Sequence, residues 1–396
     1  MKHKGLIISD IHVGAFDIEK QYNEYQVAFI DYIKNLNKLD FIIITGDYFH
    51  KKFFLNDKES LYAYKMMQEL IDVCKDMHTK IRIVYGTESH ECNQYDILNV
   101  LDLYTDIKVI KTVTDEYLFD DLHILYIPEE YMTDKYEYYK DYLYSNNVYD
   151  YIFGHGVIRE VMKDAVAHMK ASSDNKRKKV PIFTSEELGS ICNGQVYFGH
   201  YHINYNIDDK VISVGSFSRW KFGEDAPKGF YELNVDTSKF KYDFKFIENN
   251  ITDTYKTIMF GYNSDIFSDP GIMYKELNKV DKLIEADVFD NVRFDFNIPT
   301  TIESPESIIN YIKERYKYNN NIKVLFTNGY IKSRKDKDNE TLKENDKYEF
   351  IFDKSLDIPT KVSQFISIEY NKNIPIGVID RYLNADINEI LQDDIL

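Results

Sequence analysis

Apolar residues in the first 200 positions alternate between short continuous runs and longer stretches with helical spacing. The runs at 5–9, 41–45 and 81–85 have the length of buried strands. Between them, residues 18–36 and 57–77 place apolar side chains three or four positions apart, which is typical of amphipathic helices. This β-α-β-α-β order predicts an α/β fold with a largely parallel, helix-covered sheet. Further strands are expected at 107–110, 149–153 and 195–198, and a further helix at 94–104.

The pattern changes in the second half of the chain. At 211–247, short alternating strands with glycine turns suggest a second sheet packed on the first. From 251 onward, strand patterns surround a helix whose start is marked by Ser304 and Pro305, so a small α+β domain is expected. A charged and polar stretch then predicts a linker, and the last residues predict short amphipathic helices. The predicted parts are 1–250, 251–331, the linker 332–347 and a C-terminal tail 348–396.

Composition narrows the possible functions. The 396 residues exceed what one hydrophobic core usually organises, which favours two or three domains. The net charge of −17 is unlike that of proteins that bind duplex DNA through phosphate neutralisation alone, since these are usually basic. Either the substrate is not a long polyanion, or bound cations and a partner supply the positive charge.

The cysteines and the apolar runs indicate the cellular compartment. Cys74, Cys92 and Cys192 are far apart in the sequence, so neither a disulfide framework nor a zinc knuckle is expected. The longest apolar runs are only as long as strands, and no signal peptide is recognisable at the N-terminus. These features predict a cytoplasmic protein that does not contact a membrane.

Candidate chemistry lies directly after the apolar runs, where five segments carry Asp or His residues. Ligands bind α/β sheets beyond the carboxyl ends of the strands, so these side chains are expected to converge. Six of the ten histidines fall in these segments, although a single His at a strand end is more often a satisfied polar residue. The segments are Asp10-Ile11-His12, Gly46-Asp47-Tyr48-Phe49-His50, Gly86-Thr87-Glu88-Ser89-His90-Glu91, Gly154-His155 and Gly199-His200-Tyr201-His202.

The types and spacing of these residues predict a metal centre. Residues i and i+2 of an extended segment point to one side, so Asp10 with His12 can aim two ligands at one place. His200 and His202 are expected to do the same. Mixed carboxylate and imidazole ligands suit Mn²⁺, Fe²⁺ or Zn²⁺ better than Ca²⁺ or Mg²⁺. Two such ions about 3.5–4 Å apart can clamp a phosphate and lower the pKa of a bound water.

The order of these motifs resembles the signature of the calcineurin-like metallophosphoesterases. Within that superfamily the chain is most similar to the SbcD-type DNA repair exonucleases, over about residues 1–330. His50 stands where protein Ser/Thr phosphatases continue with Asp-Arg-Gly, and a small α+β domain matches the capping domain of the exonucleases. The stretches that resemble the region after their last motif are Gly215-Ser216-Phe217-Ser218-Arg219, Phe222-Gly223-Glu224 and Lys228-Gly229-Phe230.

The resemblance implies a fold and a set of site residues. The fold would be a four-layer α-β-β-α sandwich followed by the capping domain and a short helical tail. The cofactors would be two divalent metal ions, with manganese expected. His90 would contact the scissile phosphate as general acid or stabilise the leaving group, and His50 would orient the substrate. One ion would be held by Asp10, His12, Asp47 and His202, and the other by Asp47, His155 and His200, with Asp47 bridging.

The third motif departs from the pattern of the family. The family normally has Gly-Asn-His followed by Asp or Glu, and its Asn ligates the second metal. Here no Asn precedes His90, and Ser89 stands in its place. A neutral hydroxyl is a poorer ligand than an amide carbonyl, so the second site is weaker unless Glu88, Glu91 or Asn93 compensates.

The resemblance implies a metal-dependent DNA nuclease subunit with 3′-5′ exonuclease and single-strand endonuclease activity. Such a subunit acts with an SbcC-like coiled-coil ATPase in DNA recombination and repair. The tail 348–396 is then a candidate for docking the ATPase, with packing on its own domain as the alternative. A homodimer is a further expectation, with the aromatic helices near 58–104 as a candidate surface.

Two other classes of function stay open. The same metals would serve a phosphoesterase acting on a nucleotide, a small phosphodiester or a phosphoprotein. Hydrolysis of a bis-aryl phosphate without any cut in linear duplex DNA would favour that class. The altered third motif also allows a non-catalytic scaffold, which predicts no Mn²⁺-dependent cleavage and no effect of His90→Ala.

Overall fold

The computed structural model describes most of the first 261 residues and parts of the remaining chain. The described ranges are 1–54, 56–96, 106–161, 180–261, 269–285, 290–299, 305–318 and 322–327, with a few isolated positions up to 363. The chain divides into two compact units. The first is Met1–Thr257 with Asp287–Val292, and the second is Ile258–Ala286 with the described residues from Arg293 on. The predicted linker 332–347 and nearly all of the tail 348–396 lie outside the described residues.

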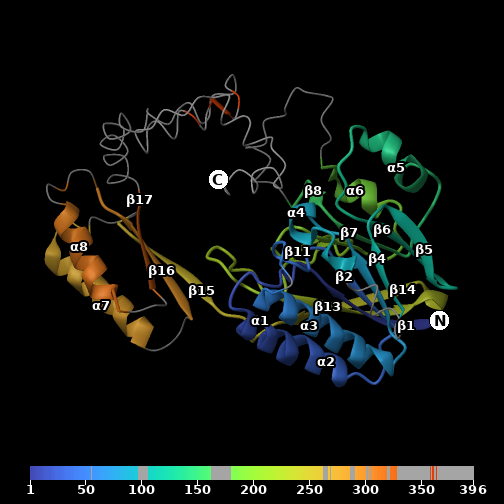
Figure 1. Ribbon diagram of the computed structural model, residues 1–396, viewed down its shortest axis with the longest axis horizontal. Coiled ribbons are helices and arrows are strands. Elements are labelled where there is room, and N and C mark those ends of the chain that lie inside the picture. Colours follow the sequence, from blue (N-terminus) through green and yellow to red (C-terminus); the bar gives the residue numbers. More distant parts are fainter. Residues whose placement is uncertain are drawn as a thin grey trace, which may run out of the picture. The chain divides into compact units, whose positions relative to one another are not determined.

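The first six-stranded sheet has the order β14-β13-β1-β2-β3-β4 (Figure 1). The four strands β1 to β4 are parallel to one another, which confirms the predicted parallel arrangement of this part of the chain. Strands β13 and β14 extend the sheet in antiparallel fashion beside β1. The bounds are β1 Lys2–Ile8, β2 Phe41–Thr45, β3 Lys80–Val84, β4 Ile107–Ile110, β13 Gly229–Asp236 and β14 Lys241–Glu248.

The second six-stranded sheet has the order β11-β12-β10-β7-β6-β5. Its four inner strands are parallel and its two edge strands are antiparallel to their neighbours. A separate two-stranded pairing joins β8 and β9. The bounds are β5 Thr114–Phe119, β6 Leu122–Ile127, β7 Tyr151–His155, β8 Val157–Ile158, β9 Ile182–Phe183, β10 Val196–Gly199, β11 Tyr205–Ile207 and β12 Val211–Ser213.

A second sheet packed on the first is present as expected, but the stretch 211–247 does not form it. Of that stretch only β12 lies in the second sheet, whereas β13 and β14 pair with the first. Conversely, β7 and β10 belong to the second sheet and not to the sheet that contains β1. Alternating apolar residues show that a segment is a strand with a buried face, but the choice of neighbour depends on packing between distant segments.

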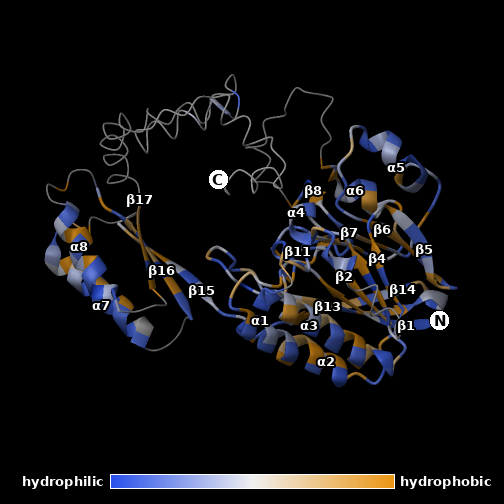
Figure 2. Cartoon of the chain, viewed as in Figure 1, coloured by the Kyte–Doolittle hydropathy of each residue, from blue (hydrophilic) through white to orange (hydrophobic). Residues whose placement is uncertain are grey.

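Three hydrophobic clusters hold the two sheets and their helices together. One cluster combines residues of both sheets, among them Ile7 and Phe41 of the first with Tyr126 and Phe153 of the second, so the sheets pack face to face. The other face of the first sheet packs on helices that cover it, and the other face of the second sheet does likewise. Figure 2 shows that the apolar colour is concentrated along the strands. The helices are α1 Ile18–Tyr25, η1 Gln26–Ile30, α2 Asp31–Lys34 and α3 Lys58–Lys75 on the first sheet, with α5 Lys135–Leu143 and α6 Ser185–Gly189 on the second.

The helix predictions in the first unit have three outcomes. The helix expected at 57–77 is α3. The one expected at 18–36 is present but contains a π-helical turn, η1, between α1 and α2. The helix expected at 94–104 lies mostly outside the described residues.

A three-stranded sheet with the order β15-β16-β17 lies mostly in the second unit. Its central strand alternates buried and half-buried residues, and the buried ones are Val292, Phe294 and Phe296. Helix α8 begins at Pro305, as the proline in a first helical turn predicts. No helix among the described residues is long and apolar enough to cross a membrane. The bounds are β15 Tyr255–Phe260, α7 Pro270–Glu285, β16 Asn291–Asn297, α8 Pro305–Tyr316 and β17 Ile322–Thr327.

Candidate metal centre

All eight side chains that the sequence singled out lie in one cluster at the ends of five strands. The strands come from both sheets: β1, β2 and β3 from the first, and β7 and β10 from the second. Because these sheets pack face to face, their strand ends meet across the core between them. The eight residues are Asp10 and His12 after β1, Asp47 and His50 after β2, His90 on α4 (Glu88–Glu91) after β3, His155 at the end of β7, and His200 and His202 after β10.

The backbone at Asp10 and His12 is not extended, so the expectation that these two share one side of an extended segment is wrong. Both residues have a φ of 47°, in the left-handed region, and Asp47 (48°) and His200 (99°) also have positive φ. After β1 ends, the chain continues beside the end of β2, where Asp10 N donates to the carbonyl of Gly46 and His12 N donates to that of Asp47. Non-glycine residues in this region carry strain of roughly 1–3 kcal/mol each and cluster at functional sites.

Two glycines allow the strand ends to approach each other. Gly46 has a φ of 86°, and a Cβ there would overlap the imidazole of His155. Gly86 lies against Asp47, and a Cβ there would overlap the backbone nitrogen and Oδ1 of that aspartate. The glycines that end the predicted strands therefore create the space for the cluster, as close approach of backbone requires.

One group of candidate ligands consists of Asp10, His12 and His202. The Nε2 atoms of His12 and His202 are 3.1 Å apart. Two nitrogens that bind one ion at right angles, each about 2.1 Å away, would lie about 3 Å apart. Nε2 of His202 is 3.8 Å from Oδ1 of Asp10, and Nε2 of His12 is 3.6 Å from Oδ2 of Asp47. This spacing fits a single cation that faces both imidazoles.

A second group consists of Glu129, His155 and His200. Oε2 of Glu129 is 3.2 Å from Nδ1 of His200 and 3.9 Å from Nε2 of His155. That same Nε2 is 3.4 Å from Oδ2 of Asp47. Since Asp47 is also close to His12 of the first group, its carboxylate lies between the two groups. This is the position that a bridging ligand occupies.

Glu129 was not predicted from the sequence. It lies two residues after β6, in Pro128-Glu129-Glu130, and it is 6% exposed. The apolar run at 122–127 is a strand signal, and an acidic pair follows it. A search for acidic residues, and not only histidines, after each apolar run would have found it.

Two of the imidazoles are oriented from behind by hydrogen bonds. Nδ1 of His155 donates to the carbonyl of Thr45 at 2.8 Å, and Nδ1 of His202 donates to Oε1 of Glu224 at 2.8 Å. Metal-binding histidines nearly always donate their other ring N–H to such a partner, which fixes the tautomer. In both cases Nε2 is left facing the cluster. Within the described part of the chain, Nε2 of the buried His155 has no hydrogen-bond partner, as a nitrogen poised for a cation would.

The buried charges of the cluster compensate one another. Burial opposes a charge on Asp47, but His155 and His12 outweigh it and hold the pKa of that carboxyl well below its usual range. Burial likewise opposes a charge on His155, but Asp47, Asp10 and Glu129 raise its pKa to about 10. A cation that binds Nε2 takes the place of a proton on that nitrogen, so its affinity rises with pH.

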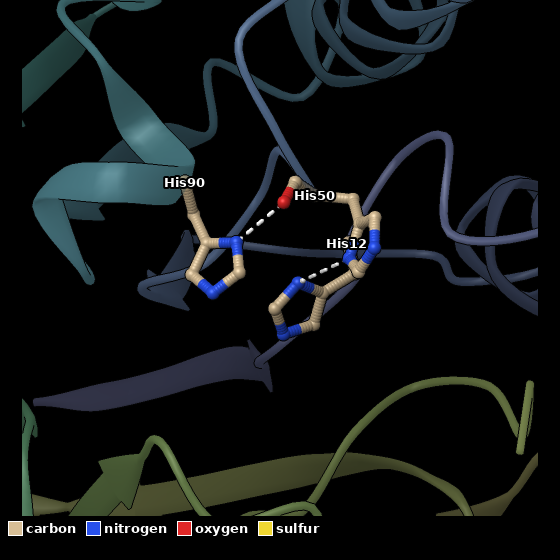
Figure 3. A group of neighbouring side chains, drawn as sticks. All are labelled: His12, His50 and His90. Carbon is tan, nitrogen blue, oxygen red and sulfur yellow. Dashed lines mark hydrogen bonds between the residues drawn. The ribbon is translucent and has the colours of Figure 1, made fainter. Parts of the chain in front are cut away.

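His50 and His90 form the rim of the cluster beside His12 (Figure 3). Nδ1 of His90 donates to the carbonyl of His50 at 2.5 Å, so its Nε2 is the nitrogen free to meet a substrate. Nδ1 of His50 is 3.4 Å from Nδ1 of His12. Burial and the nearby His90 lower the pKa of His50, which favours the neutral ring. The ring of Trp220, the only tryptophan, lies 4.9 Å from that of His12 and 4.6 Å from that of His202.

The replacements suggested for the missing Asn do not join the cluster. Glu88 and Ser89 are exposed, and neither Glu88 nor Glu91 belongs to a group of possible metal ligands among the described residues. Glu91 is fully buried and accepts hydrogen bonds from Tyr48 N and Tyr95 Oη. The side-chain oxygen of Asn93 accepts from Lys111 at 3.2 Å.

No protein-family model matches this chain, and no curated protein matches it. The case for a function therefore depends on the geometry of the cluster.

Proposed function

We propose that this chain is a two-metal phosphodiester hydrolase, and that it acts as the DNA nuclease subunit of an SbcCD-like recombination and repair complex. The observation that carries the proposal is the convergence of Asp10, Asp47, His155 and His202 from two different sheets on one buried cluster. Three hydrophobic clusters, one between the sheets and one on each outer face, support the four-layer α-β-β-α sandwich that such enzymes have.

The residues of the cluster have distinct parts in this proposal. Two divalent ions, with manganese expected, would supply charge neutralisation of the phosphodiester and activation of water. Asp10, His12 and His202 would hold one ion, and His155 and His200 the other, with Asp47 between them. His90 would bond a phosphate oxygen or the leaving oxygen through Nε2, because its Nδ1 proton is held by the carbonyl of His50. His50 would orient the phosphate beside it.

The charge of the chain supports the proposed partner. With a net charge of −17, the subunit is poorly suited to hold DNA by itself. An SbcC-like ATPase would add the missing positive surface, and the tail 348–396 is the proposed docking element. Capture of the ATPase by the full chain but not by residues 1–340 would support this docking, whereas equal capture would contradict it. Homodimerisation stays an expectation of the same resemblance.

Digestion of end-labelled duplex DNA tests the proposed activity. We expect cleavage with Mn²⁺ and none with chelator. Asp47→Asn and His90→Ala should each slow cleavage by about a hundredfold or more, since one removes the bridging carboxylate and the other a proton-transfer group. His123→Ala is the matched control, because His123 lies outside the cluster and bonds Asp115. Hydrolysis of a bis-aryl phosphate without cleavage of DNA would instead assign a small phosphodiester as substrate.

A further inference from the structure

We propose that Glu129 is a direct ligand of the second cation, so that this site is held by a carboxylate where the resembling enzymes use a neutral amide. The inference rests on the proposed function, because it takes the cluster to be a cation site. Glu129, which follows β6, would take the place of the Asn that is missing before His90 in the third motif.

The carboxylate of Glu129 is fixed in place by several contacts. Its side chain is 2% exposed. Its backbone N–H donates to the carbonyl of Tyr85, so the segment after β6 is attached to the end of β3. Tyr131 Oη donates to Oε1 at 3.0 Å, and Thr87 Oγ1 donates to Oε2 at 3.2 Å. A carboxylate with so little freedom is already in the conformation that a ligand needs.

The neighbours of this carboxylate are themselves candidate ligands. Oε2 faces Nδ1 of His200 at 3.2 Å and Nε2 of His155 at 3.9 Å. Thr87 connects this group to Asp47, because its backbone N–H donates to Oδ1 of Asp47 at 2.7 Å. Glu129 thus lies beside both imidazoles of the proposed second site. Thr87 links it to Asp47, the carboxylate proposed to bridge the two sites.

The side chain of His155 is an independent sign of a missing ligand. It is 1% exposed, and among the described residues its Nε2 has no hydrogen-bond partner although it faces two carboxylates. Buried polar atoms in native proteins are nearly always satisfied. A cation between Asp47, Glu129 and His155 would satisfy this nitrogen and both carboxylates together.

The extra carboxylate changes the charge of the centre. Asp10, Asp47 and Glu129 contribute three negative charges within the cluster, against four positive charges on two divalent ions. An amide in place of Glu129 would leave one more net positive charge. Buried carboxylates are costly unless they are paired or bind a metal. Glu129 is therefore expected to raise the affinity of the second ion above that of an amide ligand.

Mn²⁺ binding to the full chain tests the inference. The bound ions are counted by electron paramagnetic resonance at equilibrium, and quenching of Trp220 fluorescence follows the ion beside His12 and His202. Wild type is expected to bind two ions. Glu129→Ala should bind one, with unchanged quenching, and Glu129→Gln should bind the second at least about tenfold more weakly, since even an outer-shell partner contributes 10–100-fold. Glu130→Gln is the matched control, because Glu130 bonds Val113 N instead.

The possible outcomes separate the two proposals. Two ions bound equally well by wild type, Glu129→Ala and Glu129→Gln would overturn the role of Glu129 and leave the proposed function standing. If the wild type binds only one ion, the role of Glu129 is overturned as well. A wild type that binds no ion would overturn the proposed function itself. If Glu129→Ala does not fold, the comparison of Glu129→Gln with Glu130→Gln still decides, since both remove one charge and keep the side-chain length.

Discussion

At the scale of single residues, the cluster depends on which nitrogen each imidazole presents. His202 is oriented by Glu224, whose second oxygen accepts from Trp220 N at 3.2 Å. Burial opposes a charge on Glu224, but the hydrogen bond from His202 and the charge of Lys228 outweigh it and lower its pKa. Glu224 is therefore an ionised acceptor at neutral pH, and it holds the proton of His202 on Nδ1. It positions a ligand without being one.

Glu224→Gln should weaken the cation that His202 binds. The amide can present its N–H₂ group to Nδ1 and favour the wrong tautomer, which places a proton on Nε2. Loss of such a partner costs about 10–100-fold in metal affinity. The measurement is a titration of Trp220 fluorescence with Mn²⁺. Glu248→Gln removes the same charge from the exposed end of strand β14 and should leave the midpoint unchanged; equal midpoints for all three proteins would contradict the role of Glu224.

The sequence could predict the ligands because each one directly follows an apolar run, which is a local signal. Asp10, Asp47 and His155 were found in this way. Glu224 was noticed only as part of a segment that resembles the exonucleases, and its role depends on a contact with a residue 22 positions earlier. Nothing local indicates such a contact.

At the scale of elements, the short helix α4 combines two tasks. It carries His90 at the rim of the cluster, and it buries the next residue, Glu91, completely. Glu91 attaches the helix to the segment after β2 through Tyr48 N. Burial, with the negative charge of Asp47, raises the pKa of Glu91 to about 8. The anchor is therefore uncharged at neutral pH.

Glu91→Gln should flatten the dependence of stability on pH. The ordinary pKa of Glu91 is 4.5 and the folded pKa is about 8, so the folded state holds this proton over that window while the unfolded state releases it. The stability that the proton provides is complete below pH 4.5 and is lost as the pH rises toward 8. Urea unfolding in chelator measures the free energy of unfolding from pH 5 to 8. As the pH rises, this free energy should increase for the variant relative to wild type by up to about 1.4 kcal/mol per pH unit. Parallel curves would mean that Glu91 is ionised in the folded state.

The elements of the fold and the parallel arrangement of β1 to β4 were predictable, but the sheet to which each later strand belongs was not. The strands at 41–45 and 107–110 and the helix at 57–77 follow from apolar periodicity alone. The assignment of β13 to the first sheet does not, because its pairing with β1 joins residues more than 220 positions apart. Periodicity records which face of a strand is buried, not which strand lies beside it.

At the scale of the whole molecule, the candidate ligands exist as a set only in the folded chain. Segments from residue 10 to residue 202 must come together before a cation meets several of them at once. A ligand that binds only the folded state stabilises it by mass action.

Mn²⁺ should therefore raise the free energy of unfolding, by about 2.7 kcal/mol per site when its concentration is a hundredfold above the dissociation constant. Urea unfolding at neutral pH, with Mn²⁺ or with chelator, measures the difference. Asp47→Asn lacks the carboxylate between the two groups and should lose most of the gain. If Mn²⁺ stabilises both proteins to the same extent, the effect comes from general screening of the net negative charge and not from this cluster.

The cluster also lies where the two six-stranded sheets meet. Asp10, His12 and Asp47 follow strands of one sheet, whereas Glu129, His155 and His200 lie at the ends of strands of the other. Sliding one sheet past its neighbour by about 1 Å would break the coordination geometry while every strand kept its hydrogen bonds, and misplacement of that size is enough to disable a site. Cation binding would then be lost before the secondary structure melts. The bound ions therefore report how the two six-stranded sheets are aligned.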